Sequence, residues 1–136
     1  MFREEGLENV FARHERMARA ARAGMQALGL TLYSKSPSSA MTTVVAPDGV
    51  DSEKLVKHLF NRYGIKLVGG QDGAKGRIFR IAHLGYFDDF DMLVVVGAIE
   101  RGLADLGAKV QLGAGLAAAQ KAMAEAAAAS RTEQRG

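Results

Sequence analysis

Apolar residues recur at steps of three and four between Gly6 and Leu28, and this spacing predicts one face of a long helix. Gly29 follows the last of them and is typical of the left-handed residue that ends a helix. The polar face carries four arginines at steps of three, together with Glu8 and Glu15. A nucleic-acid surface is one interpretation. We favour a solvated helix surface, because the arginines spread around the helix and no aromatic residues interleave for base stacking. The apolar positions are Leu7, Val10, Phe11, His14, Met17, Ala18, Ala21, Met25 and Leu28, and the arginines are Arg13, Arg16, Arg19 and Arg22.

Short segments rich in β-branched and aromatic residues predict strands, and turn residues separate them. The predicted strands are 31–33, 41–46, 65–68 and 77–82. Residues 34–39, with Pro37 among them, predict a loop, and Pro47-Asp48-Gly49 predicts a turn. The glycine-rich segment between the last two strands predicts a hairpin.

A second helix is predicted to begin at Asp51, whose side chain suits the N-cap position. Val50 and Leu55 have the spacing of a hydrophobic staple around that cap. Gly64 is expected to end the helix. Its predicted buried stripe is Leu55, Val56, Leu59 and Phe60.

Two more helices are predicted towards the C-terminus. The first opens with Asp88, Asp89 and Asp91, which suit the positive end of a helix dipole, and closes at Gly107. The second is Ala-rich over 116–129, after which residues 130–136 are expected to fray. The predicted buried stripe of the first contains Phe90, Leu93, Val94, Ala98 and positions onward to Leu106.

This order of elements predicts the α+β class: a small, mostly antiparallel sheet of three to four strands, covered on one face by helices.

The chain has 136 residues, which suits one domain with a real core. A net charge of +3 gives no argument for nucleic acid or a membrane surface. There is no Cys, so thiolate chemistry and disulfides are excluded. No apolar run has membrane-helix length, and the charged N-terminus does not resemble a signal peptide, so we expect a cytoplasmic protein.

The segment from Gly69 to Gly85 carries the main candidate chemistry. Arg80 lies in the middle of a predicted strand, where a permanently charged guanidinium needs a partner. That partner is either an internal carboxylate, such as Asp88, Asp89 or Asp91, or an anionic ligand. Gly70, Gly73 and Gly76 match no phosphate-binding motif, since a strand and not a helix follows them. They predict a flexible hairpin loop or, as a sharper alternative, a site lining in which Gln71 or Lys75 contacts ligand.

Other polar residues give weaker signals. His14, His58 and His83 do not have metal-ligand spacing, so no metal site is predicted. Serines surround Pro37, but no histidine and acid near them suggest a nucleophile.

The run GIKLVGGQDGAKGRIFRIAHLG, residues 64–85, resembles the small domain of class V pyridoxal-phosphate aminotransferases, nearest to the alanine–glyoxylate and serine–glyoxylate (serine–pyruvate) branch. The resemblance extends over about residues 6–123. It implies the C-terminal domain of the type I pyridoxal-phosphate transferase fold over residues 1–123, with an Ala-rich helix end and flexible tail over 124–136. It also implies a homodimer and a reaction that moves an amino group from alanine or serine to glyoxylate or pyruvate.

In that family the strand arginine, here Arg80, binds the substrate carboxylate, and Gly69, Gly70 and Gln71 lie towards the active-site mouth. The resemblance places the cofactor lysine and the pyridoxal phosphate site in a large domain that would precede residue 6. We therefore expect no catalytic or cofactor-binding residue, no bound pyridoxal phosphate and no activity in this chain alone. If the resemblance describes an excised domain, its first helix should expose apolar surface. The rival interpretation is a stand-alone α+β module that binds a free carboxylate or regulates a partner.

Overall fold

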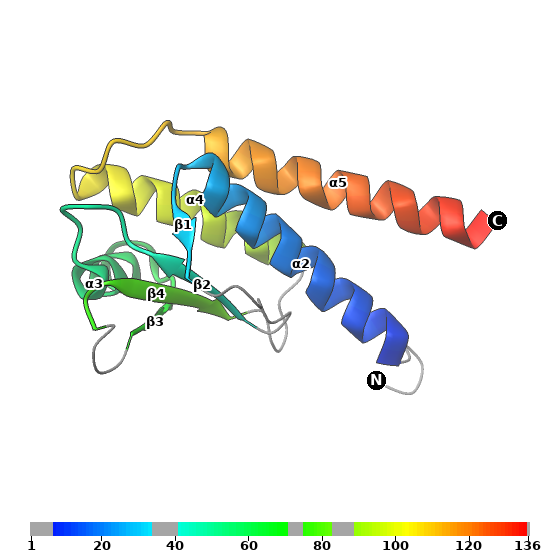
Figure 1. Ribbon diagram of the computed structural model, residues 1–136, viewed down its shortest axis with the longest axis horizontal. Coiled ribbons are helices and arrows are strands. Elements are labelled where there is room, and N and C mark those ends of the chain that lie inside the picture. Colours follow the sequence, from blue (N-terminus) through cyan, green and yellow to red (C-terminus); the bar gives the residue numbers. More distant parts are fainter. Residues whose placement is uncertain (1–6, 34–40, 71–74, 83–88, 136) are drawn as a thin grey trace.

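The computed structural model describes residues 7–33, 41–70, 75–82 and 89–135. In these ranges the chain forms a four-stranded antiparallel sheet with helices packed on it, which confirms the predicted α+β class (Figure 1). The strands stand in the order β1-β2-β4-β3. They are β1 (Thr31–Leu32), β2 (Met41–Val45), β3 (Val68–Gly69) and β4 (Ile78–Ala82). The helices are α2 (Leu7–Ala27), α3 (Ser52–Tyr63), α4 (Asp89–Asp105) and α5 (Ala114–Arg135).

The register of β2 on β4 separates two faces of the sheet. Val44 pairs with Phe79, and both side chains are fully buried in the core. Because side chains alternate along a strand, Arg80 belongs to the opposite face, where it stands in one row with Thr43 and Val68. One face of β4 therefore serves the core, while the other presents an arginine.

Helix ends follow the predicted glycines. Gly29 has φ 85° and Gly107 has φ 91°, the left-handed conformation that glycine adopts without strain. After each of them the next residue donates to a carbonyl five residues earlier, as Leu30 does to Met25, which gives a Schellman ending. At the start of α3, the Asp51 side chain accepts from the backbone N–H of Glu53 at 2.9 Å, so the predicted N-cap is confirmed.

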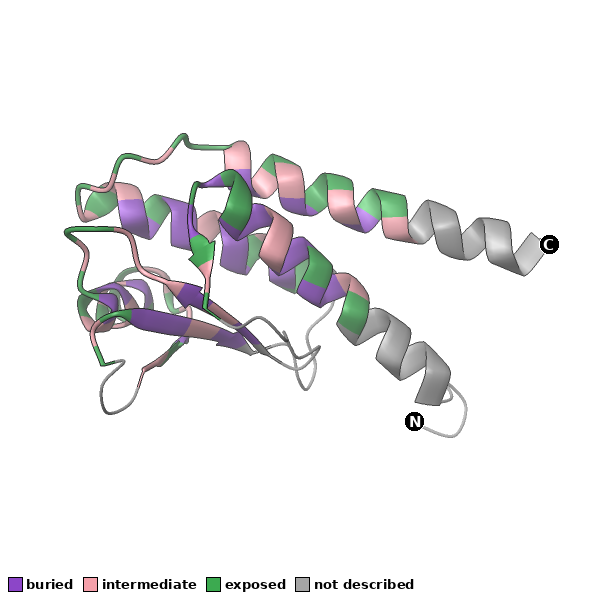
Figure 2. Cartoon of the chain, in the orientation of Figure 1, coloured by how far each residue is buried: buried purple, intermediate pink, exposed green. Residues whose placement is uncertain are grey.

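Close helix packing depends on glycines without side chains. A Cβ built on Gly24 would lie 2.9 Å from Val96 and 3.1 Å from the Gly115 carbonyl oxygen, so α2 approaches both α4 and α5 at this point. On the other side of α4, a Cβ on Gly102 would lie 2.5 Å from Leu59 of α3. Figure 2 shows the buried residues along the facing sides of these helices and of the sheet. Gly24 and Gly102 thus let the helices close over one continuous core.

The predicted stripe of α4 is only partly correct. Leu93, Ala98 and Leu106 pack against the core, but Phe90 is 76% exposed and Val94 is 58% exposed. The segment is apolar at nearly every position from 92 to 99, so the spacing of apolar residues alone did not determine which side of the helix is buried. Packing against α2 and α3 selects the face with Met92, Val95, Val96, Ile99 and Leu103.

Other boundaries also differ from the expectations. Phe60 of α3 is 58% exposed and does not join Leu55 and Leu59 in the core. The strand predicted over 65–68 is Val68–Gly69, because Ile65 donates its N–H to the Leu59 carbonyl and completes the end of α3. The loop predicted over 34–39 lies outside the described residues.

The C-terminal helix is longer than expected. α5 continues to Arg135, so residues 130–135, predicted to fray, are helical. Alanine, the strongest helix former, fills most of the preceding turns and favours this continuation. The proposed division of the chain after residue 123 stays a prediction.

The apolar surface expected on the first helix is absent from residues 15–27, the part of α2 whose side chains the structure describes. Met17, Ala21 and Met25 are fully buried there, because α4 and α5 cover that face. The large apolar side chains that are more than half exposed lie elsewhere in the described chain, at Tyr33, Phe60, Phe90, Val94 and Leu112.

Candidate functional site

Arg80 lies at the centre of β4, with Thr43 of β2 on one side and Val68 of β3 on the other. The residue is half-buried. An antiparallel sheet holds such a position rigidly, because hydrogen bonds to both neighbouring strands fix the backbone. The arginine therefore starts from a fixed base and reaches outward from the face of the sheet that the core does not use.

The guanidinium of Arg80 is held by a backbone oxygen and not by an acid. Its Nε and Nη2 atoms both donate to the carbonyl oxygen of Gly69, at 3.2 and 2.7 Å. These bonds use Nε–H and one hydrogen of Nη2. Within the described residues, the edge formed by Nη1 and the second Nη2 hydrogen has no hydrogen bond. Two parallel N–H groups on that edge match the two oxygens of a carboxylate.

The acids expected beside Arg80 give little information. Asp88 lies outside the described residues, and only the backbone of Asp89 is described. Asp91 is exposed in the first turns of α4. Sequence reasoning considered only charged partners for Arg80 and so missed the Gly69 carbonyl. A signal was present, since the predicted hairpin already placed the end of one strand beside the start of the next.

The glycine-rich segment forms the predicted hairpin, because β3 and β4 are consecutive and pair antiparallel. Gly69 ends β3 and contributes its carbonyl to Arg80, while Gly70 follows it, half-buried. Gln71 lies outside the described residues, so its predicted contact with ligand stays a prediction. The glycine-rich segment therefore reaches Arg80 through the backbone of its first glycine.

The far end of the same hairpin is attached to α3. The Gly76 carbonyl accepts from the backbone N–H of Ser52 at 3.0 Å. Lys75 lies 3.9 Å from the carboxylate of Glu53, and both side chains are exposed. Such a surface pair contributes little energy, so Lys75 keeps the freedom that its predicted ligand contact requires.

His58 is the histidine with a defined environment. Its Nε2 lies 2.9 Å from Asp105 Oδ2, and the Tyr63 hydroxyl donates to the same oxygen at 2.6 Å. The hydrogen bonds from Tyr63 and then from His58 lower the pKa of Asp105 below its ordinary value. This cluster ties α3 to the end of α4. The side chain of His14 is not described, and His83 lies outside the described residues.

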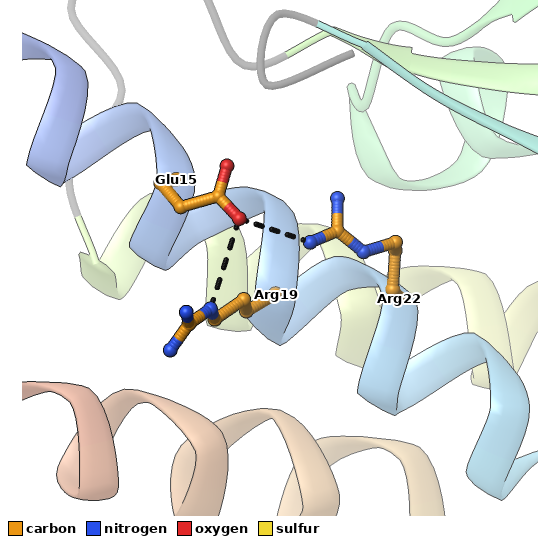
Figure 3. Close-up of polar contacts among 3 residues, drawn as sticks. All are labelled: Glu15, Arg19 and Arg22. Atoms are coloured by element: carbon orange, nitrogen blue, oxygen red, sulfur yellow. Dashed lines mark hydrogen bonds and ion pairs between the residues drawn. The ribbon is translucent and has the colours of Figure 1, made fainter. Parts of the chain in front are cut away.

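The arginine face of α2 is an ion-pair surface where the structure describes it. Figure 3 shows one carboxylate oxygen of Glu15 joined to both Arg19 and Arg22. The distances to its Oε1 atom are 3.7 Å from Arg19 Nε and 3.3 Å from Arg22 Nη2. An acid shared by two arginines reduces the positive charge of the face, in keeping with the solvated surface that we favoured.

The residues that the structure describes do not fit a pyridoxal phosphate site. A cofactor lysine has to stand in a pocket beside the cofactor ring, where the site excludes water. The six lysines that the structure describes are all exposed, and Lys35 lies outside the described residues. Nor do the described residues gather three potential metal ligands in one place. Among the described helices, none combines the length and apolarity needed to cross a membrane.

Comparisons with known proteins give a consistent result. No family model matches the chain. It is 40% identical over 125 residues to a serine–glyoxylate aminotransferase of Methylorubrum extorquens, covering 90% of this chain and 31% of that protein. It is 47% identical over 128 residues to a protein named soluble hydrogenase, small subunit, of Synechococcus sp., covering 93% and 33%.

Solved structures agree with the sequence relatives. The pyridoxamine–pyruvate aminotransferase of Mesorhizobium loti superposes with a TM-score of 0.86 at 32% identity, covering 91% of this chain and 33% of that one. The ureidoglycine–glyoxylate aminotransferase of Bacillus subtilis gives 0.83, also at 32% identity, with 88% and 32% covered. The chain thus spans about a third of the length of its relatives. With these identities along nearly its whole length, the chain belongs to the class V aminotransferase family, in which it corresponds to the C-terminal part.

Proposed function

We propose that this chain is the substrate-carboxylate-binding domain of an aminotransferase that moves an amino group from alanine or serine to glyoxylate or pyruvate. The observation that carries the proposal is the geometry of Arg80. Gly69 holds one edge of the guanidinium, and the other edge is left for two parallel bonds to a carboxylate. Amino-acid donors and 2-oxo-acid acceptors share that carboxylate, so one arginine serves both halves of the reaction.

Arg80 acts by orientation. A two-point bond fixes both the position and the rotation of the substrate, which lowers the entropic cost of reaching the reactive geometry. Gly69 keeps the guanidinium in place before substrate arrives, so less freedom is lost on binding. Pyridoxal phosphate, when bound in such an enzyme, supplies the electron sink for amino transfer. Its lysine and phosphate site would come from residues outside this chain, so the chain alone would be inactive.

A chimeric enzyme tests this proposal. The chain would replace the matched third of the serine–glyoxylate aminotransferase relative, and KM would be measured for serine and for glyoxylate. We expect an active chimera in which Arg80→Ala raises both KM values by about 100-fold, the effect of losing charged hydrogen bonds of roughly 3 kcal/mol. Arg77→Ala is the matched control, since Arg77 is exposed beside the same strand. Equal kinetics for the two variants would reject the role of Arg80.

The stand-alone module predicts different results. It requires the isolated chain to bind pyruvate or alanine at Arg80, which backbone NMR titration would detect, and it predicts a folded but inactive chimera.

We also propose that the intact enzyme is a cytoplasmic homodimer. Sedimentation of the active chimera measures the oligomeric state, and cell fractionation measures the location.

A further inference from the structure

A groove lies beside α3 and the segment that leads into β3. Its volume is about 330 Å³, and its lining residues are Val56, Lys57, Phe60, Asn61, Lys66 and Leu67. Small-molecule sites in proteins occupy roughly 300–1,000 Å³, so this groove is large enough for one small organic molecule. The groove does not include Arg80.

The floor of the groove is apolar. Leu67 is 5% exposed and belongs to the core, and Val56 is partly buried against the core. Phe60 lies on the same helix but keeps 58% of its surface exposed. An aromatic ring in this position offers a flat apolar surface, and covering it would remove apolar area from water.

The charges of the groove are both positive. Lys57 and Lys66 are exposed, and within the described residues neither forms an ion pair. Lys75, by contrast, lies beside Glu53. Asn61 adds an amide, which can donate or accept a hydrogen bond. The lining thus combines a flat apolar floor with two ammonium groups, which selects a ligand that has an apolar body and a negative charge.

We propose that this groove binds a small organic carboxylate with a flat, aromatic body. The body lies on Phe60 and Val56, and the carboxylate is held by Lys57 and Lys66. A fully apolar molecule would leave the two lysines without a partner. A small polar anion would leave Phe60 exposed. An aromatic carboxylate satisfies both parts of the lining.

Titration of the full chain with 2-naphthoate, followed by ¹H–¹⁵N NMR, tests the proposal. We expect saturable shifts at the six lining residues and weaker binding of the uncharged 2-naphthamide. The double variant Lys57→Gln/Lys66→Gln should weaken naphthoate binding by about tenfold, given the modest energy of each exposed ion pair. Lys54→Gln is the control, because Lys54 is exposed on the same helix but does not line the groove.

Three results would overturn the proposal. The first is equal binding of naphthoate and naphthamide, or equal binding by the double variant and the control. The second is shifts of similar size at Phe90 and Val94, which would show unspecific contact with exposed apolar side chains. The third is movement of the groove signals on dilution without ligand, which would show that a second copy of the chain occupies the groove. Because Lys57 and Lys66 are exposed, their substitution leaves the fold intact, and a thermal melt of each variant verifies this.

Discussion

Glu100 of α4 accepts a hydrogen bond from the backbone N–H of Leu116 in α5, at 2.9 Å. Its other carboxylate oxygen accepts from the N–H of Gly113. These N–H groups belong to the start of α5, where a helix cannot satisfy its own donors. Glu100 is only 4% exposed. A buried carboxylate on one helix thus caps the N-terminus of the next, and its negative charge suits the positive end of that helix.

Removing this cap should destabilise the chain. We expect Glu100→Ala to lower the free energy of unfolding by about 1–2 kcal/mol, since it removes the shared acceptor of the Gly113 and Leu116 N–H groups at the start of α5. Glu100→Gln retains one acceptor oxygen and should cost less. Urea denaturation measures both, with Glu125→Ala on the exposed side of α5 as the control. Equal stabilities for Glu100→Ala and Glu125→Ala would contradict the capping role.

Gly115 and Gly97 predict opposite effects of the same substitution. A Cβ on Gly115 would lie 2.9 Å from Leu28 and 3.1 Å from the Gly24 carbonyl oxygen, so Gly115→Ala should destabilise by about 1–3 kcal/mol. A Cβ on Gly97, within α4, would meet Leu116 only at 4.0 Å. There alanine should stabilise by about 0.5–1 kcal/mol through helix propensity. Thermal unfolding of the two variants measures the difference, and stabilisation by Gly115→Ala would disprove the close approach of α2 and α5.

The cluster of Asp105, Tyr63 and His58, which joins α3 to α4, should make the stability of the chain depend on pH. The bonds from Tyr63 and His58 lower its pKa in the folded chain. Tyr63→Phe should therefore raise the pKa of Asp105 towards its ordinary value, because Tyr63 makes the largest contribution. Carbon-13 NMR of the carboxyl group during an acid titration measures this. Tyr33→Phe is the control, since Tyr33 is exposed and takes no part in the cluster.

The same cluster fixes the direction of the stability change. A carboxyl group whose pKa is lower in the folded than in the unfolded chain stabilises the folded state. This contribution is fully present at pH values above the pKa of the unfolded chain, about 3.9, and is lost as the pH falls through the pKa of the folded chain. The stability difference between the original chain and Tyr63→Phe should thus be largest above about pH 4 and shrink in acid. Acid denaturation curves of both proteins that stay parallel below pH 4 would contradict the assignment.

Local signals in the sequence correctly predicted the helix ends at Gly29, Gly64 and Gly107, the start of α3 and the hairpin. Gly29, Gly64 and Gly107 adopt the left-handed conformation, and Asp51 caps α3. These features depend on a few neighbouring residues, so a short stretch of sequence determines them. The resemblance over residues 64–85 identified the family, which the comparisons confirm. The strand position had already singled out Arg80, and the resemblance assigned it to a substrate carboxylate.

Signals that depend on the tertiary structure were missed. The Gly69 carbonyl as partner of Arg80 could not be read from side-chain types, because every residue carries a carbonyl. Glu100 looked like any other helix glutamate, since the donors that it satisfies lie in a different helix. The buried face of α4 was assigned partly wrongly, at Phe90 and Val94, because an almost wholly apolar segment has no polar face that would fix which side is buried.

The corrected face of α4 gives the last prediction, which compares two neighbouring side chains. Met92 is fully buried, whereas Phe90 is 76% exposed. Met92→Ala should therefore cost about 2–4 kcal/mol of unfolding free energy, through lost transfer energy and a residual cavity. Phe90→Ala should change stability by no more than about 0.5 kcal/mol, although it removes the larger side chain. Guanidinium denaturation of the two variants measures both changes in the free energy of unfolding and shows which side chain is buried. A costly Phe90→Ala with a neutral Met92→Ala would restore the face that the periodicity first indicated, and the packing of α4 against α2 would then have to be redrawn.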